Sequence, residues 1–156
     1  MNRPRGRIAG IDFGTVRIGI AVTDPDQTLA SPLETYTRRS EALDRERFVR
    51  LAQEERLALF VVGLPVHLDG RESQKSTEAR KFGEWLATAT GVPVEYFDER
   101  FTTHEAELAL AGAKLTKKKR KERLDKLAAQ IMLAAYLESS RGSSPGAGES
   151  IRGLDE

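Results

Sequence analysis

The chain contains no cysteine, one tryptophan and two histidines among its 156 residues. The absence of cysteine excludes disulfides, a cysteine nucleophile and a zinc site with thiolate ligands, and it is consistent with a reducing compartment. No apolar run approaches the ~20 residues that a membrane-spanning helix needs, and the basic start MNRPRGR lacks the apolar core of a signal peptide. We therefore expect a cytoplasmic protein without a membrane partner.

The chain also has little net charge. Its 25 basic and 24 acidic residues leave +1, so total charge does not indicate a nucleic-acid partner. The charge is unevenly distributed, however, because the stretch KLTKKKRKERLDK at 114–126 holds eight basic residues and two acidic ones. Such a run is often only a solvated helix face, but beside a nucleic-acid site it would neutralise phosphates.

The order of apolar segments predicts one α/β domain. Five strands are expected, at 7–14, 17–24, 28–36, 57–65 and 92–99. Four helices are expected, at 40–56, 76–90, 103–111 and 119–139. The early strands follow one another directly and should pair antiparallel, whereas helices join the later strands, which implies parallel pairing. We therefore expect a five-stranded mixed sheet flanked by helices at 7–139, between a basic arm at 1–6 and a disordered tail at 140–156.

Acidic residues stand at unusual places in this pattern. Asp12 lies inside the first strand, Asp98 and Glu99 stand where the fifth strand ends, and Asp125 precedes the apolar part of the last helix. A turn hydrogen bond for Asp12 and ion pairs with neighbouring basic residues for the others would explain them without a function. Carboxylates that converge in one cleft would instead need cations, and oxygen ligands suit Mg²⁺ or Mn²⁺. Two such ions, ~3.5–4 Å apart, can promote phosphodiester hydrolysis.

Four stretches of the chain, in order, resemble one known family. They are GIDFGTVRIGIAVTD at 10–24, VVGLPVHLDG at 61–70, DERFTTHEA at 98–106 and LDKLAAQIMLAAYL at 124–137. Together they closely resemble the YqgF/RuvX family of Holliday junction resolvases and pre-16S rRNA nucleases. The resemblance implies an RNase H-like fold.

The same resemblance implies roles for individual residues. Asp12, Glu99 and Asp125 match the family's acidic triad and are therefore expected to be catalytic residues and metal ligands, with two Mg²⁺ or Mn²⁺ ions. Asp98 is the alternative ligand to Glu99. Neighbouring residues of a strand face opposite sides of the sheet, so only one of Asp98 and Glu99 can lie on the same face as Asp12.

Further residues are expected to contact the substrate. Gly14 and Thr15 would let the backbone approach a phosphate. Arg17 either contacts the substrate backbone or pairs with an acid, and Gly63 either shapes the rim of the cleft or only forms a turn. Six residues of the basic run are expected to bind nucleic acid: Lys117, Lys118, Lys119, Arg120, Lys121 and Arg123.

These observations favour a metal-dependent nuclease that processes the 5′ end of pre-16S rRNA in ribosome biogenesis. One alternative is a resolvase of branched DNA, which would act as a symmetric dimer, and another is a non-catalytic factor that binds RNA or the ribosome. GIDFGT also resembles the first phosphate loop of actin-like ATPases, but those proteins need two such domains and this chain has room for one. Structured RNA and branched DNA both stay open as partners, as do a monomer and a homodimer.

Overall fold

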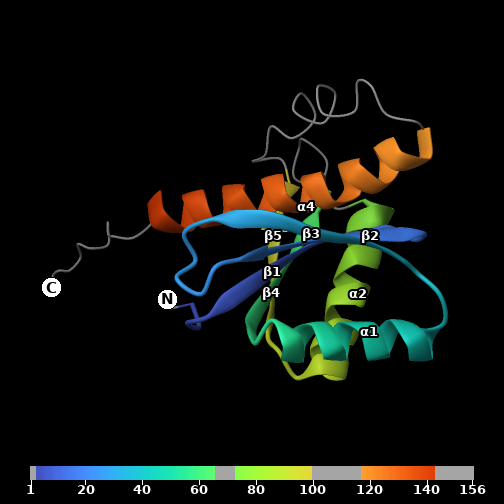
Figure 1. The fold of residues 1–156 in the computed structure, drawn as a ribbon, viewed down its shortest axis with the longest axis horizontal. Coiled ribbons are helices and arrows are strands. Elements are labelled where there is room, and N and C mark those ends of the chain that lie inside the picture. Colours follow the sequence, from blue (N-terminus) through green and yellow to red (C-terminus); the bar gives the residue numbers. More distant parts are fainter. Residues whose placement is uncertain (1–2, 66–72, 100–116, 143–156) are drawn as a thin grey trace, which may run out of the picture.

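The structure is a computed structural model that describes residues 3–65, 73–99 and 117–142, and it shows a mixed five-stranded sheet with helices on both faces (Figure 1). The strands are β1 (Arg7–Asp12), β2 (Arg17–Thr23), β3 (Ala30–Thr37), β4 (Leu57–Leu64) and β5 (Val94–Asp98). The helices are α1 (Glu41–Glu54), α2 (Gln74–Thr90) and α4 (Lys117–Gly142). The helix expected at 103–111 lies outside the described residues. The mixed sheet predicted from the sequence is confirmed.

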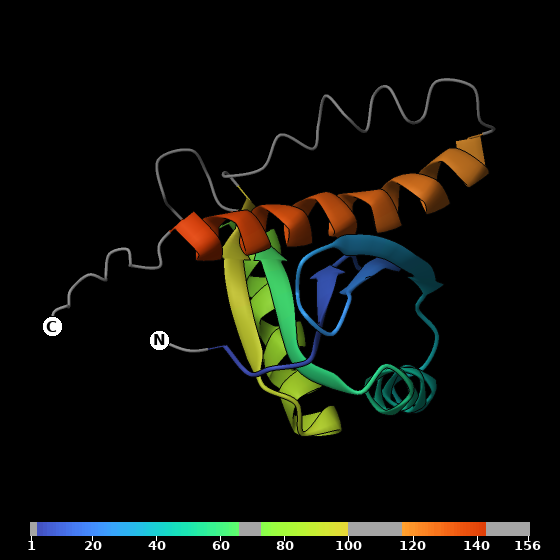
Figure 2. The same ribbon diagram turned by 60° about the vertical axis from the view of Figure 1, so that its left-hand side comes forward.

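The central strand of the sheet is β1. The strand order is β3-β2-β1-β4-β5. β1 pairs antiparallel with β2 and parallel with β4, and β4 pairs parallel with β5. The three parallel strands therefore end at the same edge of the sheet, where Figure 2 shows their arrowheads beside α4.

The edge strand β3 is irregular at its proline. Its register with β2 passes from Ile20 opposite Glu34 to Ala21 opposite Pro32, so Leu33 has no opposite residue. An extra residue of this kind is a β-bulge, and proline is tolerated there because it donates no ladder hydrogen bond. The strand expected at 28–36 is therefore present as an irregular edge strand at Ala30–Thr37.

Two apolar layers hold the helices onto the sheet. α1 and α2 cover one face through a cluster centred on Phe48, Phe60 and Leu86, and α4 covers the other through a cluster that includes Leu133. Both clusters consist of side chains removed from water, which is the main stabilising contribution to such a fold. Within the described residues, no helix is long and apolar enough to cross a membrane.

The boundaries of the helices differ in part from those expected. α1 begins after Ser40, whose hydroxyl accepts from the Leu43 amide at 3.2 Å. α2 begins two residues earlier than predicted, because Ser73 rather than Ser76 supplies the cap and accepts from the Ser76 amide at 3.1 Å. Gly91 ends α2 at φ 75°, as predicted for a glycine after a helix.

The last helix, Lys117–Gly142, is longer than predicted, and its apolar stretch lies against one side of the sheet. It continues to Gly142, so residues 140–142, expected in the tail, belong to α4. Its apolar stretch buries one face only, since Ala134 is exposed while Leu133 is completely buried. A helix lying on the outer side of a sheet needs only one apolar face.

The described part of the N-terminal arm, residues 3–6, is attached to the domain. The Gln27 side-chain amide donates to the carbonyl oxygens of Pro4 and Gly6 at 2.7 and 2.9 Å. The Arg3 guanidinium lies 5.5 Å from the ring centroid of Tyr136, which belongs to α4. These contacts place residues 3–6 against the α/β domain rather than apart from it.

Candidate active site

The ends of the three parallel strands bring acidic residues together. Asp12 is the last residue of β1, and Asp98 is the last residue of β5, with Glu99 directly after it. β4 lies between these two strands and ends at Leu64, which pairs with Asp98. The carboxyl ends of parallel strands are the usual place for sites in open sheets.

Strand alternation places Asp12 and Glu99 on the face covered by α4. Gly10, two residues before Asp12, lies against Leu133 of α4. Phe97, two residues before Glu99, belongs to the apolar cluster on the same face. Asp98 lies between Phe97 and Glu99, so alternation directs its side chain towards the opposite face. The geometry thus favours Glu99 over Asp98 as the partner of Asp12.

The Asp12 carboxyl group has a strongly perturbed proton affinity. Burial raises its pKa well above the ordinary value of 3.8, and the negative charges of Glu99 and Asp125 raise this pKa further. A hydrogen bond with the Glu99 side chain acts in the same direction. The Asp12 carboxyl group therefore lies beside the Glu99 side chain, and the negative charge of Asp125 also acts on it.

Asp125 reaches this position from α4 and is paired with a cation. The Arg17 Nε donates to Asp125 Oδ2 at 2.7 Å, and both side chains are a little over one quarter exposed. Of the two roles considered for Arg17, pairing with an acid is the one observed. Among the described residues, no three acidic or histidine side chains surround one point closely enough to hold a metal ion. Asp12 and Glu99 form one unit, and Asp125 with Arg17 forms a second beside it.

Glycines create the space for these carboxyl groups. A Cβ atom on Gly63 would lie 2.3 Å from Glu99 Oε2, so this position in β4 accommodates the Glu99 carboxylate. A Cβ atom on Gly19 would lie only 1.9 Å from the backbone oxygen of Asp125, so α4 touches β2 at the turn that carries Asp125. Gly19 pairs with Asp12 across the β1–β2 ladder. Sequence reasoning considered Gly63 but missed Gly19.

Known proteins resemble this chain in sequence and in fold. A family model described as "RuvX: Holliday junction resolvase" matches residues 6–139. The chain belongs to the RuvX family. A protein of Rhodopirellula baltica named "Putative pre-16S rRNA nuclease" is 52% identical over 136 residues, covering 87% of this chain and 79% of that one. A protein of Koribacter versatilis with the same name is 40% identical over 133 residues, or 85% of this chain and 87% of that one.

Solved structures show that the RuvX-family chain has the expected RNase H-like fold. Thermus thermophilus RuvC, solved in complex with a Holliday junction substrate, matches with a TM-score of 0.56 at 19% identity, over 89% of this chain and 98% of that one. The yeast mitochondrial Holliday junction resolvase Ydc2 matches with a TM-score of 0.54 at 9% identity, over 88% and 80% of the two chains. At these identities the likeness concerns the fold.

In this RuvX-family chain, Gly14 and Thr15 lie in the turn after Asp12, where the backbone was expected to approach a phosphate. A Cβ atom on Gly14 would lie 2.4 Å from the backbone oxygen of Arg17, so glycine is required there by the turn itself. Thr15, next in the turn, is exposed. Phosphate contact by these two residues stays a prediction.

The basic run occupies the first turns of α4, before Asp125. α4 begins at Lys117, so a helical backbone is described for the run, whereas the side chains of residues 117–123 lie outside the described ones. One helical turn spans 3.6 residues, which places the run within about two turns of Asp125. The basic run therefore lies close to Asp125, and its binding of nucleic acid stays a prediction.

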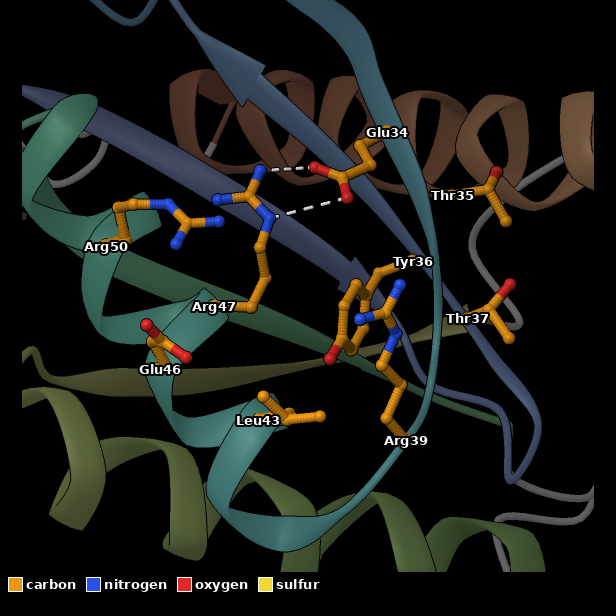
Figure 3. Close-up of a pocket in the computed structure, with 9 residues that line it drawn as sticks. All are labelled: Glu34, Thr35, Tyr36, Thr37, Arg39, Leu43, Glu46, Arg47 and Arg50. Atoms are coloured by element: carbon orange, nitrogen blue, oxygen red, sulfur yellow. Dashed lines mark hydrogen bonds and ion pairs between the residues drawn. The ribbon is translucent and has the colours of Figure 1, made fainter.

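A cavity elsewhere on the RuvX-family chain is lined by both basic and acidic side chains. It measures about 480 Å³ and lies between β3 and α1 (Figure 3). The Arg47 side chain extends to Glu34, with Nε donating at 3.4 Å and a second bond from Nη2. This hydrogen bonding raises the pKa of Arg47, and Glu54 lies 4.0 Å from the same side chain. The Arg47 guanidinium at this cavity is thus neutralised by Glu34 and Glu54.

Proposed function

We propose that this RuvX-family protein is a metal-dependent nuclease that hydrolyses phosphodiester bonds in processing the 5′ end of pre-16S rRNA in the cytoplasm. The observation that carries the proposal is that Asp12 is buried beside Glu99 and Asp125, and that this burial and the two negative charges raise the pKa of Asp12. Such perturbed acids cluster at functional sites. The names of the relatives from Rhodopirellula baltica and Koribacter versatilis support pre-16S rRNA as the substrate.

The donor set fits one or two divalent cations. It consists of carboxylate oxygens only, which suit Mg²⁺ or Mn²⁺, and the negative charges of Glu99 and Asp125 beside Asp12 are what a divalent cation would neutralise. Asp12 and Glu99 would hold the metal, with Asp125 as the third ligand. A bound ion would activate water and stabilise the leaving oxygen.

The chain's own residues prepare this site. Gly63 leaves room for the Glu99 carboxylate on the α4 face, and the contact between Gly19 and α4 fixes the turn that carries Asp125. Arg17 pairs with Asp125, and a guanidinium at this position is also suited to a substrate phosphate. The basic run before Asp125 would then neutralise phosphates further along the substrate.

A second candidate is Holliday junction resolution. It is favoured by the description of the matching family and by the fold shared with Thermus thermophilus RuvC. The hydrolytic chemistry would be the same, but a resolvase would cut a two-fold symmetric junction as a symmetric dimer. A non-catalytic RNA-binding role is the third possibility, and only activity distinguishes it from the other two.

The test uses a matched pair of variants at the end of β5. The protein is incubated with Mg²⁺ or Mn²⁺ and either a labelled precursor rRNA end or a four-way DNA junction. We expect cleavage of the RNA by the native protein and by Asp98→Asn, and its loss in Glu99→Gln, because only Glu99 faces Asp12. Paired symmetric cuts in the junction alone would favour the resolvase. Binding without cleavage of either substrate would contradict the nuclease.

A second prediction concerns the competition of Arg17 with the metal for Asp125. Arg17→Gln removes the competing cation, so Mn²⁺ binding measured by calorimetry should tighten severalfold while RNA cleavage falls. Arg17→Lys keeps the positive charge and should leave the Mn²⁺ affinity close to that of the native protein. Weaker Mn²⁺ binding in Arg17→Gln would show instead that Arg17 only supports the fold of the site.

A further inference from the structure

A pocket lies on the other side of the strand end that carries Asp12. It measures about 700 Å³ and opens between the β1–β2 turn, the segment after β3, and helices α1 and α2. Phe13 follows Asp12 directly and packs with the cluster on the α1 and α2 face. The lining residues, which define the Phe13 pocket, are Phe13, Thr15, Val16, Arg38, Arg39, Glu41, Asp44, Glu78, Lys81, Phe82 and Trp85.

Aromatic rings form the apolar part of the Phe13 pocket. The ring centroids of Phe13 and Phe82 are 4.9 Å apart, and those of Phe82 and Trp85 are 5.4 Å apart. The Arg38 guanidinium lies 5.3 Å from the Phe13 ring centroid. Phe13 and Trp85 are partly exposed, and Val16 is 60% exposed at the rim. Flat aromatic and guanidinium surfaces of this kind are those on which unpaired bases stack.

The charges of the Phe13 pocket balance one another. Its lining contains three basic and three acidic side chains. Two of the acids already have partners: Asp44 accepts from the Tyr36 hydroxyl at 2.7 Å, and Glu41 accepts from Trp85 Nε1 at 3.0 Å. A pocket without excess positive charge does not select a phosphate, but it suits an uncharged planar group that carries hydrogen-bond donors and acceptors.

The Phe13 pocket is held in shape by hydrogen bonds. The Arg38 amide donates to the Val16 carbonyl oxygen at 2.9 Å, which ties the β1–β2 turn to the segment after β3. The Arg39 amide donates to Asp44 Oδ1 at 3.0 Å, which ties that segment to α1. Because these walls are already connected, binding a small group there would cost little ordering of the chain.

The position of the pocket indicates what occupies it. Asp12 and Phe13 are consecutive, with the carboxylate on the α4 face and the ring on the opposite face, and exposed Thr15, in the turn after them, lines the pocket. A nucleic-acid strand whose phosphate lies at Asp12 would therefore pass within reach of the pocket. We propose that the Phe13 pocket binds one unpaired nucleobase of the substrate, next to the phosphate that is cut. The inference rests on the proposed function for the identity of the substrate.

This subsite would make the protein selective for single-stranded substrate at the cut. A base that is paired and stacked inside a duplex cannot enter a pocket between aromatic side chains without leaving its own stack. A precursor rRNA end with an unpaired nucleotide could bind at both the carboxylates and the pocket, whereas a continuous duplex could bind at the carboxylates only.

The single tryptophan of the chain makes the proposal directly measurable. Trp85 lines the pocket, and no other residue contributes tryptophan fluorescence. In buffer with a chelator, to prevent cleavage, the protein is titrated with a single-stranded RNA hexamer, with the same hexamer in a duplex, and with a hexamer that carries one abasic position. We expect quenching by the single strand, much weaker quenching by the duplex, and a reduced response to the abasic strand.

A matched pair of variants identifies the pocket. Val16→Asp places a charge at its rim, whereas Leu29→Asp makes the same change at a residue that does not line the pocket. Both positions are exposed, at 60% and 66%, so both variants should fold. We expect about tenfold weaker binding of the single strand by Val16→Asp, in the range that one stacked base contributes, and unchanged binding by Leu29→Asp.

The outcomes separate the pocket from the nuclease. Equal responses to single strand and duplex, or binding that leaves Trp85 fluorescence unchanged, would overturn the pocket proposal even if RNA is cleaved. Quenching that Val16→Asp abolishes, in a protein that cleaves neither substrate, would support the pocket and contradict the nuclease. Equal weakening by Val16→Asp and Leu29→Asp would also overturn it, because the effect would then come from added negative charge alone.

Discussion

Asp12→Asn should abolish cleavage and, at neutral pH, stabilise the fold. Asparagine keeps the size of the side chain but cannot supply a carboxylate to a divalent cation. Loss of a ligand that positions the ion removes several kcal/mol of transition-state stabilisation, and about 4 kcal/mol corresponds to roughly a thousandfold in rate. A cleavage assay with the precursor rRNA end would measure this loss, and retained cleavage would contradict the role of Asp12.

The expected gain in stability follows from the raised pKa of Asp12. Below the ordinary value of 3.8, this carboxyl group is protonated in both the folded and the unfolded chain, so it imposes no penalty. As the pH rises through the interval up to the raised pKa, the unfolded chain loses the proton while the folded chain retains it, and folding becomes progressively less favourable. Asp12→Asn should therefore match the native protein near about pH 3 and melt at a higher temperature near about pH 7.

A second buried aspartate provides the control for this stability measurement. Asp44 is only 3% exposed, but it accepts hydrogen bonds from the Tyr36 hydroxyl and the Arg39 amide and lies 3.5 Å from Arg38 Nε. Asp44→Asn loses that ion pair and an acceptor, so its melting temperature should fall at neutral pH. A higher melting temperature for Asp12→Asn and a lower one for Asp44→Asn would show that the Asp12 carboxylate destabilises the fold, whereas the Asp44 carboxylate stabilises it. A fall in Asp12→Asn as well would contradict this distinction.

The sequence predicted the sheet because its strands have clear apolar patterns and clear stops. The run from Leu57 to Leu64 reads as a strand buried on both faces, and it is one. The resemblance to the RuvX family named Asp12, Glu99 and Asp125 before any geometry was known. The choice between Asp98 and Glu99 needed the register of β5 against β4, which no single stretch of sequence contains.

Contacts between distant segments could not be predicted from the sequence. Arg17 and Asp125 are 108 positions apart, and only the placement of α4 across β2 pairs them. The start of α2 was placed two residues late, and the cap at Ser73 was not recognised because it follows a polar stretch without apolar periodicity. Gly19 stands in an ordinary apolar strand pattern, so nothing local indicates that a helix backbone lies against it.

The two glycines of the site should respond differently to alanine. At Gly19 the new Cβ would meet the backbone oxygen of Asp125 at 1.9 Å, and a helix backbone can yield only if α4 moves away from β2. Overpacking of this kind costs about 1–3 kcal/mol or more, and it would also move Asp125 away from Asp12. Gly19→Ala should therefore lose both stability in urea denaturation and cleavage of the precursor RNA.

At Gly63 the new Cβ would instead meet the end of the Glu99 side chain, at 2.3 Å from Oε2. A side-chain end can rotate away, so Gly63→Ala should cost less than about 1 kcal/mol of stability, but the displaced carboxylate would lose its hydrogen bond with Asp12. Cleavage should thus fall in both variants and stability in Gly19→Ala only. If Gly63→Ala retained full cleavage, the Glu99 carboxylate would not need its place beside Asp12. If Gly19→Ala retained full stability, the close contact between α4 and β2 would not be what holds Asp125 at the site.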